Sequence, residues 1–307
     1  MLKKIIQSMA NRLYASLDRS FKEGLREAGR NEMLNRFFSV ASDLETLTKI
    51  VGSQRFRNMP MPQEVPNPDG DRLLVYAPHQ DDETLGAGGT LLRSIERGKR
   101  IKIVYVTDGA ARKSPSNDET LVTIRELEAA DVWDGHKIEP PVFMRRPCRN
   151  LSADDTTARE IRDQIASFQP SCIFVPSLFE EPEDHRTTVE LLIKADSLDP
   201  IPDDVEIWSY QVTGMLAPNV VIDITGLTTQ KYEMNSKWGS QMSFFNWAHA
   251  NRGLNAYNAI YLPKTPTADR DSGRTKNPTE LFAELFHVLP MKEFRTFAHP
   301  FFVSEHS

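Results

Sequence analysis

The sequence predicts an α/β fold: a Rossmann-like, doubly wound and mostly parallel sheet with helices on both faces, preceded by an N-terminal helical extension. Two observations predict it. From about residue 72, short apolar runs alternate with longer stretches of helical spacing, which is typical of parallel strands joined by helices. Polar side chains also cluster where three of these runs end, and open sheets of this class bind ligands at the carboxyl ends of their strands.

The predicted strands are short and rich in Val, Ile and Leu. They span residues 73–77, 101–106, 142–144, 171–175, 205–211 and 220–224. The predicted helices lie at about 84–97, 119–133 and 154–168, from 187 onwards, and in one long helix around 227–252. Continuous apolar runs of this length predict strands that are buried on both faces.

The first seventy residues differ from the rest. Residues 1–56 are predicted to be helical, because apolar residues recur at helical spacing and the first proline is Pro60. Closely spaced prolines then predict a linker over residues 57–70, and the α/β domain spans residues 71–307. Residues 1–30 are rich in Lys and Arg. We expect the extension to dock on the core or on another subunit, in a homo-oligomer, and its basic residues leave a membrane-surface helix as the alternative.

Composition excludes several classes of protein. The 307 residues carry 37 basic and 43 acidic side chains, a net charge of −6, which argues against a dedicated nucleic-acid binder. No apolar run is long enough to span a membrane. Gln7, Asn11 and Arg12 interrupt the first apolar run too early for a signal peptide, so we expect a cytoplasmic protein. Cys148 and Cys172 form no metal-binding pair and are expected to be small core residues.

Four titratable residues follow the first predicted strand: His79, Asp81, Asp82 and Glu83. One acid could cap the next helix, but four polar groups exceed that need. An imidazole and a carboxylate three residues apart can converge on one metal ion at such a turn. These donors suit Zn²⁺ or another divalent cation, so the sequence predicts a metal site here.

A catalytic metal site needs a further ligand from another strand end, and His185 is the best candidate. It follows the predicted strand at 171–175 by about ten residues and lies at the same edge of the sheet. A carboxylate that does not bind the ion can take a proton from metal-bound water and return it to a leaving amine. Asp81 and Asp82 are adjacent, so one can bind the metal while the other acts as this base.

Residues 77–83 read A-P-H-Q-D-D-E, and Gly88 and Gly89 follow them. This stretch resembles the P-H-P-D-D-E…G-G signature of the PIG-L / LmbE-like N-deacetylases. Weaker matches follow in the order of the family, at residues 107–109, 125–128, 184–186, 223–225, 231, 240–241 and 284–286. The resemblance covers about residues 72–290.

The resemblance implies a Rossmann-like fold and a zinc site made of His79, Asp82 and His185, with Asp81 as the general base. It also implies that the substrates are N-acetylated amino sugars carried on lipids, thiols or antibiotics. The residues expected on the substrate side are Gln80, Asp108, Arg125, Asp184 and Arg252.

Two positions depart from the family pattern. Gln80 replaces the usual proline, and its amide could hydrogen-bond a substrate. Pro182 stands where the family has a histidine that helps to stabilise the tetrahedral intermediate. We expect His249, as a catalytic residue, or Arg252 to take over that role.

The predicted function is that of a metal-dependent hydrolase that removes an N-acetyl group from an amino sugar or glycoconjugate and releases acetate. The expected partner is a small-molecule or glycan substrate bearing that group. An amidase or esterase acting on another acyl group, and a non-catalytic sugar-binding protein, are the alternatives. The glycines at 86–89 lack the spacing of a dinucleotide-binding loop and are expected to let a helix pack closely on the sheet. Specificity is expected to lie in residues 110–118, 179–183 and 263–278.

Overall fold

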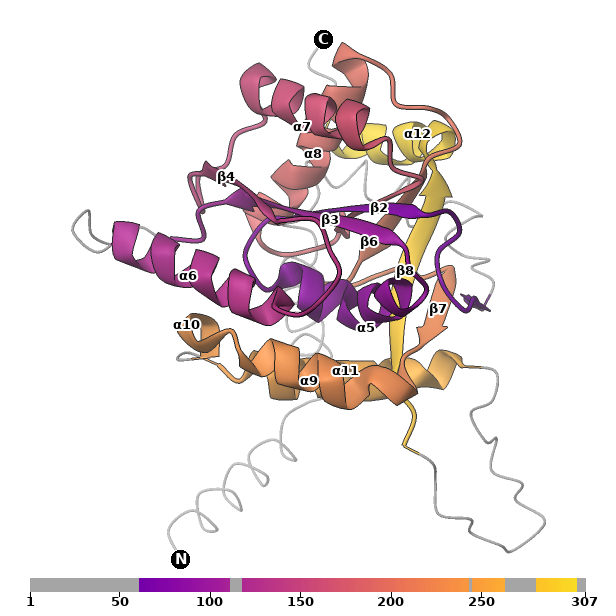
Figure 1. Cartoon of the computed structure of the whole chain (residues 1–307). Coiled ribbons are helices and arrows are strands. Elements are labelled where there is room, and N and C mark those ends of the chain that lie inside the picture. Colours follow the sequence, from indigo (N-terminus) through magenta and orange to yellow (C-terminus); the bar gives the residue numbers. More distant parts are fainter. Residues whose placement is uncertain (1–60, 111–117, 243–244, 263–279, 303–307) are drawn as a thin grey trace, which may run out of the picture. The chain divides into compact units, whose positions relative to one another are not determined.

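The computed structural model describes residues 61–110, 118–242, 245–262 and 280–302 (Figure 1). These residues build an eight-stranded sheet in the order β1-β7-β8-β6-β5-β2-β3-β4. Its strands are β1 (Gln63–Glu64), β2 (Arg72–Ala77), β3 (Arg100–Thr107), β4 (Val142–Arg146), β5 (Cys172–Pro176), β6 (Glu206–Tyr210), β7 (Val220–Asp223) and β8 (Ala283–Pro290). Neighbouring strands are parallel, except that β8 runs antiparallel to β6 and β7. The predicted α/β fold with a mostly parallel sheet is confirmed.

Helices cover both faces of this sheet (Figure 1). On one face lie α7 (Asp155–Phe168), α8 (Glu183–Leu198) and α12 (Met291–Phe302). On the other face lie α5 (Asp82–Glu96), α6 (Asp118–Trp133), α9 (Thr228–Ser236), α10 (Gly239–Met242) and α11 (Trp247–Asn258). Short 3₁₀ turns precede α9 and follow α11, at Thr225–Leu227 and Ala259–Tyr261. The sheet is therefore the middle layer of three.

β2 lies at the switch point of the sheet. The chain passes from β2 to β3 and β4 on one side, then returns to β5 and β6 on the other side. The helices that follow β2 and β5 consequently cover opposite faces of the sheet (Figure 1). In open α/β sheets, ligands bind outside the carboxyl ends of the strands at this point. The loops after β2 and β5 are therefore where a site is expected.

The central strands are buried because they have neighbours on both sides and helices on both faces. Five of the six residues of β2 are buried, and so are all five residues of β5. A strand in this position has no face on which a polar side chain can reach water. The continuous apolar runs in the sequence therefore correctly predicted that these strands are buried in the middle of the sheet.

Two glycines bring α5 close to the sheet. A methyl group at Gly86 would lie 2.2 Å from Cδ2 of Tyr210, and one at Gly89 would lie 2.7 Å from Cγ2 of Ile224. Contacts this short do not occur between carbon atoms in folded proteins, so larger residues would push the helix away. The predicted role of these glycines in helix packing is confirmed.

The long helix predicted around residues 227–252 is wrong, because the chain forms α9, α10 and α11 there. The break buries Trp238, whose Nε1 donates a hydrogen bond to Thr84 Oγ1 at 2.8 Å. α11 then begins anew, with the side chain of Asn246 accepting a hydrogen bond from the backbone of His249. The chain thus breaks the helix to bury one large aromatic side chain, although the spacing of its apolar residues would allow the helix to continue.

The start of α8 also differs from the prediction. α8 begins at Glu183 rather than near residue 187. Pro182 precedes it, and Glu183 and Asp184 occupy its first turn, where the backbone N–H groups favour negative charge. His185 therefore lies in the first turn of a helix instead of in a loop.

The predicted extension, residues 1–56, lies outside the described residues, and so does the first part of the linker. The described part of the linker is attached to the sheet, because β1 pairs in parallel with β7. Most of the loops at 110–118 and 263–278 also lie outside the described residues. No helix within the described ranges is both long and apolar enough to cross a membrane.

Candidate metal centre

The turn between β2 and α5 has an unusual backbone at Asp81. Its φ is 139°, a conformation that residues other than glycine rarely adopt. Its carbonyl accepts hydrogen bonds from the backbone N–H groups of Thr84, at 3.1 Å, and Leu85, at 2.9 Å. Such strain persists only where the surrounding structure holds it in place, and it is found mainly at functional sites.

His79, Asp82 and His185 form what we call the first cluster. Oδ2 of Asp82 lies 3.2 Å from Nδ1 of His79 and 3.3 Å from Nε2 of His185. One donor atom from each of the three residues lies within 4.8 Å of the others. The segments that follow β2 and β5, which are neighbours in the sheet, supply these residues, with Asp82 at the start of α5 and His185 in the first turn of α8. The structure thus brings together the three predicted metal ligands.

The donors of the first cluster fit a divalent ion such as Zn²⁺. Two imidazole nitrogens and one carboxylate oxygen are common zinc ligands, and three protein ligands leave a position for water or substrate. The side chains of Asp82 and His185 are almost fully buried, and that of His79 is 18% exposed. A buried carboxylate between two imidazoles needs nearby positive charge, which a metal ion would supply.

In the first cluster, the carboxylate and the imidazoles stabilise each other's charged forms. Burial opposes ionisation of Asp82, but the imidazoles of His185 and His79 outweigh it and hold the pKa of this carboxyl well below its usual value. Burial also lowers the pKa of His185, yet Asp82 and Glu180 together raise it to about 9. A metal ion must displace these imidazole protons, so its affinity is expected to rise with pH.

Asp184, predicted on the substrate side, lies behind His79. Its Oδ2 is 2.9 Å from Nε2 of His79, the nitrogen that faces away from Asp82. The backbone N–H of Arg149 donates to the same oxygen at 2.7 Å. A carboxylate in this position orients a metal-binding imidazole and raises its basicity. The geometry therefore favours a positioning role for Asp184.

Glu180, which the sequence did not single out, lies behind His185. Its Oε2 is 3.6 Å from Nδ1 of His185. Its carboxylate also accepts hydrogen bonds from backbone N–H groups of Val212, Thr213 and Gly214, at 2.7, 3.1 and 2.9 Å. The only signal in the sequence was a pair of acids before a proline, which is usual in a solvated turn.

Asp81 lies next to the first cluster without belonging to it. Burial and the neighbouring charge of Asp82 raise the pKa of Asp81 well above its usual value, although His79 and Arg125 act in the opposite sense. A carboxylate with a raised pKa is a better proton acceptor than an ordinary one. Its environment is therefore compatible with the predicted role of general base.

Glu83, the fourth titratable residue of the turn, is fully buried beneath it. It accepts hydrogen bonds from the hydroxyl of Tyr105, at 2.7 Å, and from Nε1 of Trp133, at 3.0 Å. It also accepts one from the backbone N–H of Asp81, at 3.4 Å. Burial raises the pKa of Glu83 to about 7 in spite of these donors. This acid thus has a structural role.

Gln80 and Arg125, predicted on the substrate side, meet over Gly109. A methyl group at Gly109 would lie 2.3 Å from Oε1 of Gln80 and 2.4 Å from Nη1 of Arg125. Gly109 has a φ of 65°, which glycine adopts without strain. Nε2 of Gln80 donates to the carbonyl of Thr107 at 3.3 Å. The structure therefore brings these two side chains together beside the turn.

The other predicted residues are placed differently. Oδ1 of Asp108 accepts hydrogen bonds from the backbone of Ala110 and Cys148, so its carboxylate holds the turn after β3. His249 is exposed on α11. Arg252 is also exposed, and its guanidinium packs on two aromatic rings. Neither belongs to the first cluster, and their role in stabilising an intermediate stays a prediction.

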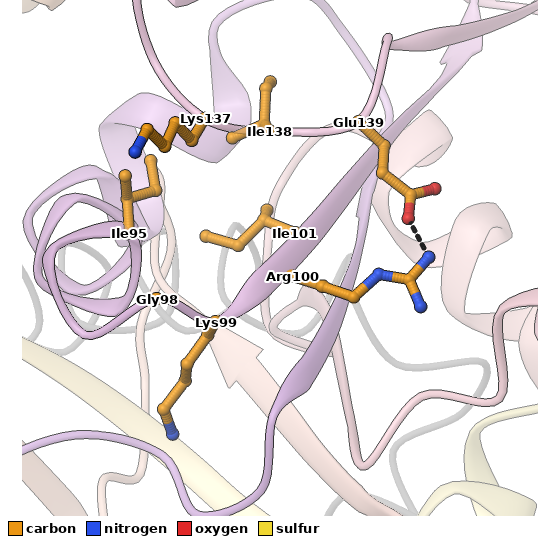
Figure 2. A pocket seen from close by; sticks show the side chains of 8 residues that line it. All are labelled: Ile95, Gly98, Lys99, Arg100, Ile101, Lys137, Ile138 and Glu139. Atoms are coloured by element: carbon orange, nitrogen blue, oxygen red, sulfur yellow. Dashed lines mark hydrogen bonds and ion pairs between the residues drawn. The ribbon is translucent and has the colours of Figure 1, made fainter.

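A separate cavity of about 370 Å³ lies where α5 ends and β3 begins (Figure 2). It is lined by Ile95, Gly98, Lys99, Arg100, Ile101, Lys137, Ile138 and Glu139. Figure 2 shows the side chain of Arg100 directed at Glu139, with which it forms an ion pair. The first cluster lies at the other end of the parallel strands, so this cavity is not part of that site.

Solved structures with a similar fold include two deacetylases and a hydratase. N,N'-diacetylchitobiose deacetylase from Pyrococcus horikoshii is 20% identical, with a TM-score of 0.60, and the match covers 86% of this chain and 94% of that one. A deacetylase of teicoplanin biosynthesis is 18% identical, with a TM-score of 0.53 and coverages of 71% and 98%. The 4-carboxy-2-hydroxymuconate hydratase from Pseudomonas putida KT2440 is 18% identical, with a TM-score of 0.55 and coverages of 72% and 96%. At these identities the likeness shows the fold alone.

A family model matches the part of the chain that carries the first cluster. The model is that of PIG-L, described as GlcNAc-PI de-N-acetylase, and it matches residues 74–195. This range contains His79, Asp82 and His185 together with the strands and helices that position them. The resemblance noted in the sequence is confirmed, and the chain carries a PIG-L family domain at residues 74–195.

Proposed function

We propose that this chain is a metal-dependent N-deacetylase that removes the acetyl group of an N-acetylated amino sugar or glycoconjugate. The observation that carries the proposal is the first cluster, with Asp81 beside it, at the switch point of a PIG-L domain. The description of the family names a de-N-acetylase of GlcNAc-PI, and one structural relative deacetylates N,N'-diacetylchitobiose. Both descriptions support N-acetylglucosamine as the group that this chain is proposed to recognise.

His79, Asp82 and His185 are the residues that would hold the ion, which is Zn²⁺ in the simplest case. When bound, such an ion polarises the amide carbonyl and lowers the pKa of a coordinated water towards about 7. Asp184 orients the imidazole of His79 through a contact of 2.9 Å, and the charge of Glu180, 3.6 Å from Nδ1 of His185, favours one orientation of the other imidazole.

Asp81 is proposed as the general base. It is adjacent in sequence to Asp82, so its carboxylate diverges from the one that binds the ion. It takes a proton from the attacking water and returns it to the nitrogen as the C–N bond breaks. Water and the amide are converted to acetate and a free amine. Glu83 holds the backbone N–H of Asp81 and so helps to keep this carboxylate in place.

Gln80 and Arg125 are proposed to contact the sugar. Oε1 of Gln80 and Nε of Arg125 are buried, and neither has a hydrogen-bond partner among the described residues. Unpaired buried polar atoms are costly, and the hydroxyl groups of a sugar could pair with both an acceptor and a donor. Gln80 stands where the family has a proline, which has no side-chain amide, so this contact with the sugar would be a feature of this chain.

The proposal is tested by metal analysis and acetate release with the purified full-length chain. The substrates are N-acetylglucosamine and N,N'-diacetylchitobiose, with simple acyl esters and longer-chain amides for comparison. Asp81→Asn is expected to bind as much zinc as the wild type and to lose about 10²- to 10⁴-fold in kcat. Asp131→Asn, which changes an exposed carboxylate of α6, is the matched control and should retain the full rate.

Three results would count against the proposal in different ways. An unaltered rate for Asp81→Asn would remove this residue as the base. Faster cleavage of esters than of N-acetyl sugars would favour an acyl hydrolase of another kind. Sugar binding without acetate release from any substrate, by a zinc-loaded protein, would favour a non-catalytic sugar-binding protein.

A further inference from the structure

The imidazole of His79 lies between two carboxylates. Its Nδ1 is 3.2 Å from Asp82, within the first cluster, and its Nε2 is 2.9 Å from Asp184 on the opposite side of the ring. The sulfur of Cys148 completes a second group with His79 and Asp184. Donor atoms of His79, Cys148 and Asp184 all lie within 4.8 Å of one another. We call these three residues the second cluster.

The second cluster has the composition and burial of a binding site for a cation. Cys148 is 6% exposed and Asp184 is 3% exposed, so water does not solvate their side chains freely. Oδ1 of Asp184 is buried and has no hydrogen-bond partner among the described residues. A thiolate, an imidazole and a carboxylate together are a ligand set for zinc and for softer ions such as Cd²⁺.

The backbone holds the second cluster in place from both sides. The N–H of Cys148 donates to Oδ1 of Asp108 at 3.1 Å, and the N–H of Arg149 donates to Oδ2 of Asp184 at 2.7 Å. The segment after β4 is therefore tied to the turn after β3 and to the first turn of α8. A cation could bind here with only small movements of side chains.

We propose that the second cluster is an inhibitory site for a thiophilic divalent cation, Zn²⁺ or Cd²⁺, next to the metal site of the first cluster. Binding there would release the thiol proton of Cys148 and the Nε2 proton of His79 to solvent. Loss of the Nε2 proton would also break the hydrogen bond between His79 and Asp184. That hydrogen bond otherwise orients the imidazole for the first cluster. Metal binding at the second cluster does not depend on the proposed function, whereas its inhibitory effect does.

The binding is tested by absorption spectroscopy on the full-length chain loaded with one equivalent of zinc and titrated with CdCl₂. Cadmium bound to a thiolate has a sulfur-to-metal charge-transfer band in the near ultraviolet. The first cluster contains no sulfur, so the band reports the second cluster alone. We expect the band in the wild type and its loss in Cys148→Ser. Cys172→Ser, which changes the only other cysteine, is the matched control and should retain the band.

A wild-type protein without the band would overturn the proposal, and so would a band that survives in Cys148→Ser or disappears in Cys172→Ser. Circular dichroism verifies that each variant is folded, and Cys148→Ala serves in place of the serine variant if that one is not.

The inhibitory effect is tested by titrating excess zinc into the acetate-release assay, with each protein compared with its own rate at one equivalent. Inhibition of Cys148→Ser should require about tenfold more zinc than inhibition of the wild type, since loss of one ligand weakens a site by at least that factor. Equal sensitivity would overturn the inhibitory role. A chain that releases no acetate would contradict the proposed function, and the charge-transfer band would still decide whether the second cluster binds metal.

Discussion

Glu180 acts on the candidate metal site through another residue, because it contacts His185 without belonging to the first cluster. Its carboxylate is completely buried and is held by the backbone of residues 212–214. Its negative charge, 3.6 Å from Nδ1 of His185, favours a proton on that nitrogen and leaves Nε2 for a metal ion. Histidine ligands in proteins are commonly oriented by carboxylates in this way.

Replacing Glu180 by glutamine keeps its size but removes its charge, and it is expected to weaken zinc binding about 10- to 100-fold. Isothermal titration with zinc measures the affinity. Glu181→Gln is the matched control, because Glu181 is the neighbouring acid and is exposed. Equal affinities for the two variants would show that Glu180 only anchors the loop at 212–214.

At the scale of single residues, the sequence identified the members of the first cluster but not the residues that support them. His79, Asp82 and His185 stand out because their types and their places after apolar runs are visible locally. The roles of Glu180 and Glu83 depend on donors that lie far away in the sequence. Asp184 was expected to meet the substrate, and only the packing of α8 against the turn after β2 placed it behind His79.

Among the elements, α5 is constrained most closely, because it begins at the candidate site and packs on the sheet through glycines. Gly86→Ala is expected to lower the free energy of unfolding by about 1–3 kcal/mol, since the added methyl group overlaps the ring of Tyr210. Urea unfolding measures the change. Gly253→Ala on α11 is the control: nothing lies near its added methyl group, and its helix propensity should increase stability by up to about 1 kcal/mol. Similar effects of the two substitutions would contradict the packing argument.

A buried ion pair joins α9 and α5 to β8. Nζ of Lys231 lies 2.6 Å from Oε1 of Glu284 and donates to the carbonyl of Leu85 at 2.9 Å. Burial lowers the pKa of Lys231, and the charge of Glu284 opposes this shift. Glu284 also accepts hydrogen bonds from the backbone N–H groups of Gly89 and Thr90 in the middle of α5. The pair thus links three elements that are distant in the sequence.

Lys231→Met is expected to lower the free energy of unfolding by about 3–5 kcal/mol, because it leaves a buried carboxylate without its cation. The matched control is Lys237→Met, whose partner Asp131 is exposed, and there the expected loss is below about 1 kcal/mol. Urea unfolding at neutral pH measures both. A loss at Lys231 no larger than that at Lys237 would show that the remaining hydrogen bonds of Glu284 suffice.

For the whole molecule, zinc should stabilise the folded state, because the three donors of the first cluster converge only when β2 and β5 are paired. At a free zinc concentration of about 100 times its Kd, the free energy of unfolding should rise by about 2.7 kcal/mol. Thermal unfolding with zinc and after treatment with a chelator measures this difference. His185→Ala should lose the stabilisation, and His299→Ala, which changes an exposed histidine of α12, should keep it. A stabilisation that survives in His185→Ala would place the ion elsewhere.

The sequence by itself determined the class of fold and the place of the site. Apolar runs of strand length and a group of titratable residues at one turn are local patterns, and parallel strands bring their carboxyl ends to one edge of a sheet. The tertiary structure alone decided how the acids of that turn divide their roles. Asp82 faces two imidazoles, Glu83 meets Tyr105 and Trp133, and the sulfur of Cys148 lies beside His79. These roles depend on which side chains, distant in the sequence, pack against each acid. The spacing of residues in the sequence does not predict such contacts.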